Sequence, residues 1–415
     1  MSVSTPQVRQ RDAALRARAG AVIPGGMYGH QDAGRLPASY PQFFERSAGC
    51  HVWDSDGNEY IDLMCSWGPV LLGHQHPKVE EAAAAQRARG DCQNGPGPVM
   101  VELAELLVER VRHAEWAMFA KNGTDATTTA LMVARAATGR RKFLAARGSY
   151  HGSAPWCTPR LDGTTPQDRE NIILFEYNDI ASVTAAADQA GGDLAGVIVT
   201  PFRHDAGFDQ ELADPGFARA LRDLCDRRQA ALVLDDIRCG LRLNGGGSWE
   251  PIGVDPDLST WSKAIANGYP LSAVLGNDRF RDGASRLFVT GSFWLSAAAM
   301  AASVATLHAH QDEGALSQLE HAGNLLRGGL GEQAAAHGLA IRQTGPVQMP
   351  YLTFAADTAY ERMSLFAGTA LENGVYLHPT HNWFLSAAHA DRDIQRALEA
   401  TDRAFRAVRN QYGPG

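Results

Sequence analysis

The stretch LSTWSKAIANGYPLSAVLG, residues 258 to 276, contains a single charged residue, Lys263, within a run of apolar and small residues. Lysine is among the side chains that are least often fully buried. Such a lysine is either a surface residue whose stem lies along apolar side chains or an amine in a partly desolvated pocket. In a pocket the amine loses its proton more readily and becomes a nucleophile that forms Schiff bases with carbonyl groups.

Short apolar runs alternate with helical patterns from about residue 100 to Lys263 and beyond. The run VELAELLVERV places Leu103, Leu106, Leu107 and Val111 on one helical face. Strands alternating with helices predict an α/β fold with a mostly parallel sheet covered on both faces. The predicted strands include residues 118–120, 142–146, 196–199 and 231–234.

The length of 415 residues favours two domains. We expect an N-terminal arm and part of a small domain in residues 1–70, a large domain in 71–304 and the rest of the small domain in 305–415. The first segment contains a predicted hairpin around Asp56-Gly57, where apolar and polar residues alternate. The last segment is predicted to be helix-rich with one or two strands.

Composition excludes several classes of protein. The formal net charge is −8 and the basic residues are scattered, so we expect no nucleic-acid partner. Apolar runs are shorter than the roughly 20 residues that cross a bilayer, and the start lacks the apolar core of a secretory signal. A cytoplasmic protein without a membrane partner is therefore expected. The six cysteines form no C-x-x-C pair, which argues against disulfides and a metal site and favours core packing. The NGGGS run at 244–248 is predicted to be a flexible loop.

A glycine turn in KNGTD, residues 121–125, joins a predicted strand to a helix N-terminus. The backbone N–H groups of Gly123 and Thr124, together with the threonine hydroxyl, could hold a phosphate group there. The alternative is an ordinary helix N-cap at Thr124, with Asp125 stabilising the first turn.

Two carboxylates, Asp235 and Asp236, end the apolar strand ALVL. A carboxylate at such a strand end can keep a ring nitrogen protonated or bind a metal, and the alternative is a capping or loop aspartate. Ligands of open parallel sheets bind beyond these carboxyl ends. A phosphate cradle, a carboxylate for a pyridine nitrogen and a Schiff-base lysine are together the three attachments that pyridoxal 5′-phosphate requires.

The chain resembles the class III aminotransferases, which belong to the fold-type-I pyridoxal-phosphate enzymes, and within them most of all the glutamate-1-semialdehyde aminomutase branch. The resemblance runs through almost the whole chain and is carried by IPGG (23–26), WDSDGNEYIDL (53–63), SWGP (66–69), LGHQHP (72–77), NGTDAT (122–127), ARAATGR (134–140), GSYHG (148–152), LDD (234–236), PDLSTWSK (256–263) and FLSAAHADRDI (384–394).

This resemblance implies a role for each matching residue. Lys263 would form the Schiff base and then move a proton between substrate and cofactor, while Asp235 would hold the pyridinium. Tyr150 would stack on the ring beside His151, and Gly123 and Thr124 would bind the phosphate. Ser292 would contribute a hydroxyl to the phosphate of the partner subunit, which implies a homodimer with shared active sites.

Positions that face the substrate in the family differ here. Where the aminomutases carry an arginine that grips the substrate carboxylate, an ungapped match gives Asp32, with Arg35 close by. Tyr28 and His30 lie in the same run, and Trp67 lies at the position of the substrate entrance. His381 stands where the aminomutases carry a glutamate, and Trp294 lies just before another run, 295–297, that differs from the family. An anionic side chain repels a carboxylate, so we expect a cationic or neutral polar substrate.

These features predict an aminotransferase that moves an amino group from an amine donor to the aldehyde or ketone of a specialised small molecule, with pyridoxamine 5′-phosphate as the cofactor form between the two half-reactions. One alternative is an aminomutase, which moves the amine within one molecule. A non-enzymatic cofactor-binding protein is a third reading, disfavoured because both Lys263 and Asp235 are present.

Overall fold

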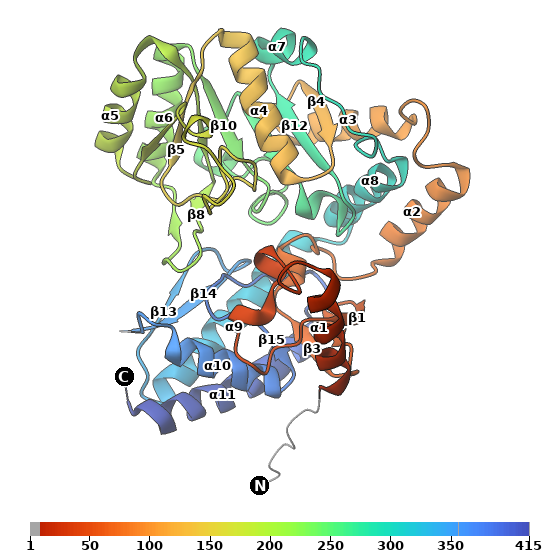
Figure 1. Ribbon diagram of the computed structural model, residues 1–415, viewed down its shortest axis with the longest axis vertical. Coiled ribbons are helices and arrows are strands. Elements are labelled where there is room, and N and C mark those ends of the chain that lie inside the picture. The colour runs from red at the N-terminus through yellow and green to blue at the C-terminus, as the bar shows by residue number, and fades with distance from the viewer. Residues whose placement is uncertain (1–8, 356, 415) are drawn as a thin grey trace. The chain divides into compact units, whose positions relative to one another are not determined.

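The computed structural model describes residues 9–355 and 357–414 (Figure 1). Residues 1–8 of the predicted first segment lie outside the described residues. The chain forms two compact units: unit 1 combines Met1–His76 with Ser317–Gly415, and unit 2 is Pro77–Leu316. The segments predicted from the sequence divide the chain at 70/71 and 304/305, before the unit boundaries at 76/77 and 316/317.

Unit 2 is built around a seven-stranded sheet in the order β4-β12-β11-β10-β7-β5-β6 (Figure 1). Only β12 runs antiparallel to its neighbours β11 and β4, so the sheet is mostly parallel, as predicted. The strands are β4 (Trp116–Ala120), β5 (Lys142–Ala146), β6 (Ile172–Phe175), β7 (Leu194–Val199), β10 (Ala231–Asp235), β11 (Leu258–Trp261) and β12 (Ser272–Gly276), with a separate pair β8 (Phe202–Arg203) and β9 (Glu211–Leu212).

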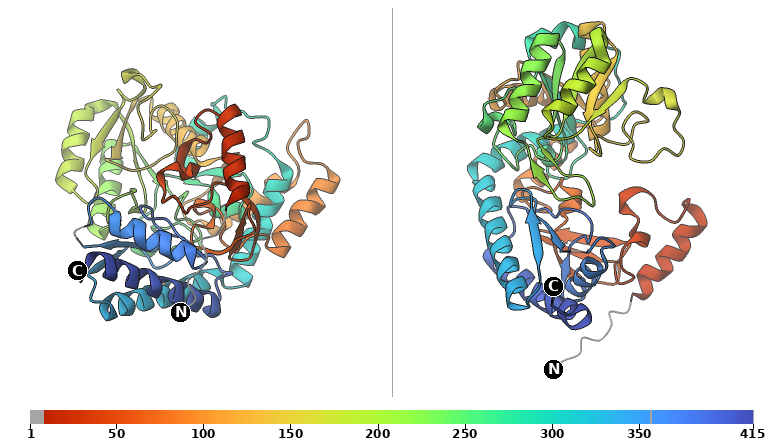
Figure 2. Two further views of the ribbon diagram at one scale, coloured as in Figure 1. Left: turned by 60° about the horizontal axis from the view of Figure 1, so that its bottom comes forward. Right: turned by 90° about the vertical axis from the view of Figure 1, so that its left-hand side faces the viewer.

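Helices cover both faces of this sheet (Figure 2). The helices of unit 2 are α2 (Pro77–Arg89), α3 (Val99–Arg110), α4 (Gly123–Thr138), α5 (Ile180–Ala190), α6 (Pro215–Arg228), α7 (Arg281–Ser285) and α8 (Ala297–Asp312). In α3 the predicted face is buried at Leu103 and Leu107, and Val111 follows at its C-cap.

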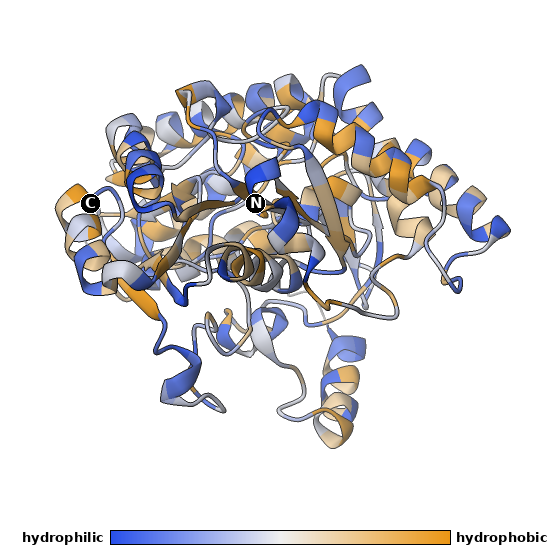
Figure 3. Cartoon of the chain, turned by 90° about the horizontal axis from the view of Figure 1, so that it is seen from above, coloured by the Kyte–Doolittle hydropathy of each residue, from blue (hydrophilic) through white to orange (hydrophobic). Residues whose placement is uncertain are grey.

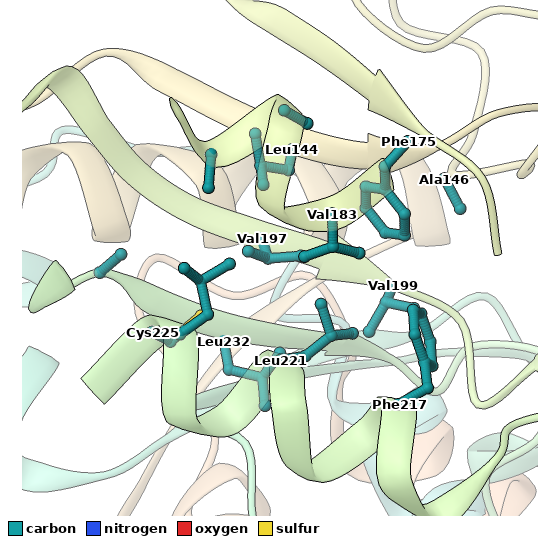
Figure 4. Packing of buried hydrophobic residues seen from close by; sticks show 14 of the residues in the cluster. Leu144, Ala146, Phe175, Val183, Val197, Val199, Phe217, Leu221, Cys225 and Leu232 are labelled. Carbon is teal, nitrogen blue, oxygen red and sulfur yellow. The ribbon is translucent and has the colours of Figure 1, made fainter. Parts of the chain in front are cut away.

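Strand β10 shows why these apolar runs form a central sheet. Leu232 and Leu234 pack on one face against α5 and α6 (Figure 4), whereas Ala231 and Val233 pack on the other face against residues of α4. Successive side chains of a strand point to opposite faces, so a strand between two helical layers must be apolar throughout. The hydropathy colouring accordingly shows predominantly apolar strands and helices with one apolar and one polar side (Figure 3).

Unit 1 contains a four-stranded sheet in which the C-terminal strand β15 pairs in parallel with the N-terminal strand β3. The predicted hairpin is confirmed as the antiparallel pair β2–β3, and Gly57 in its turn has a φ of +87°. Among the described residues after 305 there are three strands, rather than one or two. The elements are α1 (Gln10–Val22), β1 (Phe44–Ala48), β2 (His51–Asp54), β3 (Glu59–Asp62), β13 (Ile341–Thr344), β14 (Tyr351–Phe354), α10 (Glu361–Glu372), β15 (Val375–Tyr376), α11 (Asp391–Tyr412) and α9 (Ala315–Ala336), which begins at the unit boundary.

Two expectations about local sequence need correction. All six cysteines are free and four are buried, but Cys92 is exposed and is no core residue. The NGGGS run is a loop, but it is tied down: Gly247 N donates to Glu250 Oε1 at 2.8 Å and Ser248 N donates to Asp236 Oδ2 at 3.0 Å. In the described part of the chain, no helix combines the length and apolarity that crossing a membrane requires.

Candidate active site

A cavity of about 520 Å³ lies in unit 2 where the strands of the sheet end. Its lining comes from the first turn of α4, from Tyr150–Ser153, and from segments that follow β8, β10 and β11. The predicted residues Gly123, Thr124, Tyr150, His151, Asp235 and Lys263 all line it. The topology therefore brings together residues that are far apart in the sequence, at the sheet edge where ligands of parallel sheets bind.

Lys263 lies two residues beyond β11, at the start of the 3-10 turn Lys263–Ala266, with a left-handed φ of +50°. Burial around the ammonium group, followed by the charge of Arg238, lowers the pKa of Lys263 to about 7, and Asp235 opposes this shift. A large share of the amine is therefore neutral near pH 7, which is the protonation state that attacks a carbonyl carbon.

Asp235, the last residue of β10, is buried and held by groups from two other elements. Its Oδ1 accepts a hydrogen bond from Thr260 Oγ1 at 3.1 Å, across the parallel pairing of β10 with β11. Its Oδ2 lies 2.7 Å from His151 Nδ1. These contacts fix the orientation of the carboxylate, so that it can face a protonated ring nitrogen in the cavity.

The first turn of α4 forms another wall of the cavity. Asn122 is the N-cap, because its side chain accepts from Asp125 N, and Thr124 is therefore a residue of the first turn rather than the cap. Gly152 presses against this turn: a Cβ atom there would lie 2.5 Å from Thr124 Oγ1, and Gly152 has a φ of +122°. The N–H groups at a helix N-terminus lack intrahelical acceptors and favour an anion such as phosphate.

His151 and Tyr150 close the cavity from the segment after β5. The ring of His151 is buried, stacks on Trp156 with a centroid separation of 6.2 Å, and its Nε2 has no hydrogen-bond partner among the described residues. Tyr150 is partly exposed to the cavity, and burial of its other atoms raises the pKa of its phenol.

Arg238 and His204 are among the cavity residues that the sequence analysis did not predict. Arg238 is buried and donates from Nη1 to the carbonyl oxygen of His204 at 3.1 Å. Both ring nitrogens of His204 lack a partner among the described residues, and burial lowers the pKa of this imidazole well below its usual range. Both residues closely follow the end of a strand. This position relative to the predicted strands could have marked them as candidates for the cavity.

The residues of this cavity fit pyridoxal phosphate. They provide an amine for its aldehyde, an oriented carboxylate for its ring nitrogen and a helix N-terminus for its phosphate. The volume lies within the roughly 300–1,000 Å³ of small-molecule sites. Glycines at positions 123 and 152 keep the phosphate end open, since added Cβ atoms would collide with Ile237 and Thr124.

Ser292 and Trp294 do not line this cavity. Ser292 is exposed on the segment between α7 and α8, and Trp294 folds back on Gly291, where an added Cβ atom would lie 2.2 Å from the indole nitrogen. The exposure of Ser292 leaves its hydroxyl accessible from outside its own chain.

A second cavity, of about 560 Å³, lies within unit 1. His30 and Trp67 line it, with their ring centroids 4.8 Å apart. His381 and His378 also meet Trp67 edge-on, at 5.0 and 5.2 Å. The structure thus brings together three predicted substrate residues and adds His378, a half-buried imidazole that the sequence did not single out.

The other three predicted substrate residues of unit 1 do not line this second cavity. Asp32 uses its carboxylate to accept a hydrogen bond from Gly34 N at 2.9 Å and so caps the short helix Ala33–Arg35. Arg35 is exposed, and Tyr28 is 73% exposed. Asp32 therefore caps a short helix, a role that the sequence analysis did not predict.

Comparison with known proteins gives consistent results. The family model described as aminotransferase class-III matches residues 35–390. An aminopentol aminotransferase of Sphingopyxis macrogoltabida is 50% identical over 97% of this chain and 95% of its own length. A glutamate-1-semialdehyde 2,1-aminomutase of Chloroflexus aurantiacus is 36% identical over 98% of both chains. The structure of the FumI protein of Sphingopyxis sp. MTA144, in its PLP internal aldimine form, is 50% identical over 97% of both chains with a TM-score of 0.96.

Proposed function

Because this chain belongs to the class III aminotransferases and is a pyridoxal-phosphate-dependent enzyme, we propose that it removes the primary amine of a hydroxylated aliphatic compound and passes it to a small carbonyl acceptor. The substrate class is supported by the 50% identity to a relative named for aminopentol, an amino alcohol. Identity to the aminomutase is lower, at 36%, and an intermolecular reaction is accordingly favoured over isomerisation.

The observation that carries this proposal is the single cavity shared by Lys263, Asp235 and the N-terminus of α4. When bound there, pyridoxal phosphate supplies an aldehyde that captures amines and a ring that withdraws electrons from the substrate carbon. The rest of the chemistry falls to the residues of this chain.

Lys263 acts as the base and acid of each half-reaction. Its neutral Nζ is favoured by a pKa of about 7 and would take the proton from the carbon that bears the substrate amine. Its protonated form would then donate a proton to the former aldehyde carbon of the cofactor. Asp235, oriented by His151 and Thr260, would pair with the protonated ring nitrogen of the bound cofactor. Tyr150 covers the ring, and Gly123 and Thr124 bind the phosphate through the first turn of α4.

We assign recognition of the rest of the substrate to residues of unit 1, with Trp67, His30 and His381 as the main contacts. Three imidazole edges around an indole give an apolar surface that also offers hydrogen bonds, as a hydroxylated carbon chain requires. The capping role of Asp32 and the exposure of Arg35 support a substrate without a carboxylate beside the reacting carbon.

We extend the proposal to a homodimer in which Ser292 binds the phosphate of the partner subunit. The segment around Ser292 exposes Phe288 by 90% and Phe293 by 61%, and large exposed aromatic side chains in one segment favour an interface. A mixture of Lys263→Ala and Ser292→Ala chains tests this directly. Reassociated heterodimers contain one intact site if sites are shared, so activity returns on mixing; independent sites leave the mixture at the level of the separate variants.

The substrate is tested by the visible spectrum of the holoenzyme during single turnover with a panel of amines. A hydroxylated aliphatic amine should convert the cofactor to pyridoxamine 5′-phosphate and release a carbonyl product, with glutamate and alanine as comparison donors. Return of an isomer from one amino aldehyde, without a separate donor, would instead establish the aminomutase reaction.

A further inference from the structure

Cys50, His51 and Asp393 form a cluster in unit 1 that the proposed transamination does not use. Cys50 lies in the turn between β1 and β2, His51 begins β2, and Asp393 lies in the first turn of α11. One donor atom from each residue lies within 4.8 Å of the other two. Cys50 and Asp393 are each 3% exposed and His51 is half-buried, so the donors meet largely out of bulk water.

The separation between His51 and Asp393 matches two ligands of one ion. His51 Nε2 lies 3.4 Å from Asp393 Oδ1, longer than the roughly 2.7–3.2 Å of an N–H···O hydrogen bond. Two ligands with metal bonds of about 2.0–2.1 Å at a tetrahedral angle lie about 3.3 Å apart. The pair is therefore spaced as it would be around zinc.

The groups behind these donors are arranged as in metal sites. His51 Nδ1 lies 3.0 Å from Glu59 Oε1, close enough for an ion pair, although the two groups are not aligned for a hydrogen bond. Metal-binding histidines usually have a carboxylate beside their other ring nitrogen. Asp393 Oδ2 accepts from Ala390 N at 3.2 Å, which holds the carboxylate and leaves Oδ1 for His51 and an ion.

The charge around Cys50 also favours a cation. Asp393 is one of the three grouped donors, and Asp62 adds a second carboxylate whose charge acts on the Cys50 sulfur. The guanidinium of Arg392 lies 3.8 Å from Asp393 but is exposed, so it offsets this negative charge only weakly. A divalent ion compensates the acidic groups and binds the sulfur as a thiolate.

We propose that Cys50 Sγ, His51 Nε2 and Asp393 Oδ1 form a zinc-type divalent-metal site with a fourth position for water, which ties the β1–β2 turn to the start of α11. A thiolate and an imidazole favour zinc over magnesium or calcium, which prefer oxygen ligands. The sequence shows no metal-binding motif because the donors of this site come from positions 50, 51 and 393, near opposite ends of the chain.

The test is titration of chelator-treated holoenzyme with Co²⁺, followed in the visible region beyond the cofactor absorption, with competition by Zn²⁺. Wild type should bind one Co²⁺ per chain with the intense bands of a tetrahedral thiolate complex, and Zn²⁺ should displace it. Cys50→Ser and His51→Gln should lose these bands. Cys92→Ser, which removes the exposed cysteine, is the matched control and should keep them.

Glu59→Gln gives a milder variant in case the cysteine or histidine variants fold poorly. It should bind Co²⁺ at least about tenfold more weakly than wild type, because it loses only the negative charge beside His51 Nδ1. Absence of stoichiometric binding in wild type, or equal binding in Cys50→Ser or Glu59→Gln, overturns the proposal. Neither result affects transamination, so the function proposed above stands or fails separately.

Discussion

Replacing Arg238 with methionine should raise the pKa of Lys263. The pKa of Lys263 is lowered from 10.5 to about 7, a difference that corresponds to roughly 5 kcal/mol between its charged and neutral forms. Burial is the largest cause and Arg238 the second, while Asp235 and Cys239 oppose them and Arg242 adds to them. A nearby charge shifts a pKa by about 1 to 3 units. We therefore expect a pKa of about 8.5 for Lys263 in the Arg238→Met variant, because the amine stays buried.

The sign of the pH effect follows from the neutral amine being the nucleophile. In wild type the amine is largely neutral above about pH 7 and charged below it, so capture of the cofactor aldehyde slows as the pH falls through 7. With a pKa of about 8.5, the neutral fraction at pH 7.5 drops from roughly three quarters to roughly one tenth. Because the unfolded lysine keeps its proton up to about 10.5, Lys263 also makes wild-type apoenzyme more stable as pH rises from 7 towards 10.5.

The assay is competitive acylation of the apoenzyme at a series of pH values, read out by mass spectrometry for each lysine. The chain has only four lysines, so Lys78, Lys121 and Lys142 serve as internal standards. Arg238→Lys keeps the positive charge and is the matched control, with a midpoint near that of wild type. An unchanged midpoint for Lys263 in Arg238→Met, or an equal rise in Arg238→Lys, would refute the electrostatic reasoning.

Three other changes have definite expected outcomes. Lys263→Ala should abolish transamination and leave the cofactor non-covalently bound; steady turnover with retained covalent attachment elsewhere contradicts the assignment. Asp235→Asn should lower kcat by at least about a hundredfold, as loss of charge stabilisation does elsewhere, with little change in thermal stability as the check on folding. Gly152→Ala should weaken binding of pyridoxal phosphate to the apoenzyme, measured by equilibrium dialysis, because its Cβ atom meets Thr124 Oγ1 at 2.5 Å and φ is +122°; unchanged affinity means that the turn shifts without affecting the phosphate site.

The sequence by itself predicted the mostly parallel sheet, four of its strands, and six residues that line the cavity of unit 2. Strands β5 and β10 begin at the predicted residues, because a strand buried on both faces must be an unbroken apolar run. Lys263, Asp235 and the NGTD turn could be recognised one by one, since each directly follows such a run or precedes a helical one. Their common cavity follows from parallel topology, which brings carboxyl ends to the same edge.

Only the tertiary structure decided which side chains face these residues. Arg238 donates to the carbonyl oxygen of His204, and Asp236 holds Ser248 of the NGGGS loop, and no local pattern in the sequence encodes these contacts. The cap at Asp32 was likewise visible only in the structure, and so was the grouping of Cys50 and His51 with Asp393. Periodicity reports the face on which a residue lies, because that depends on local backbone geometry. Which distant groups lie opposite that face depends on the packing of the whole unit, and this packing sets the distances, the burial and hence the pKa values.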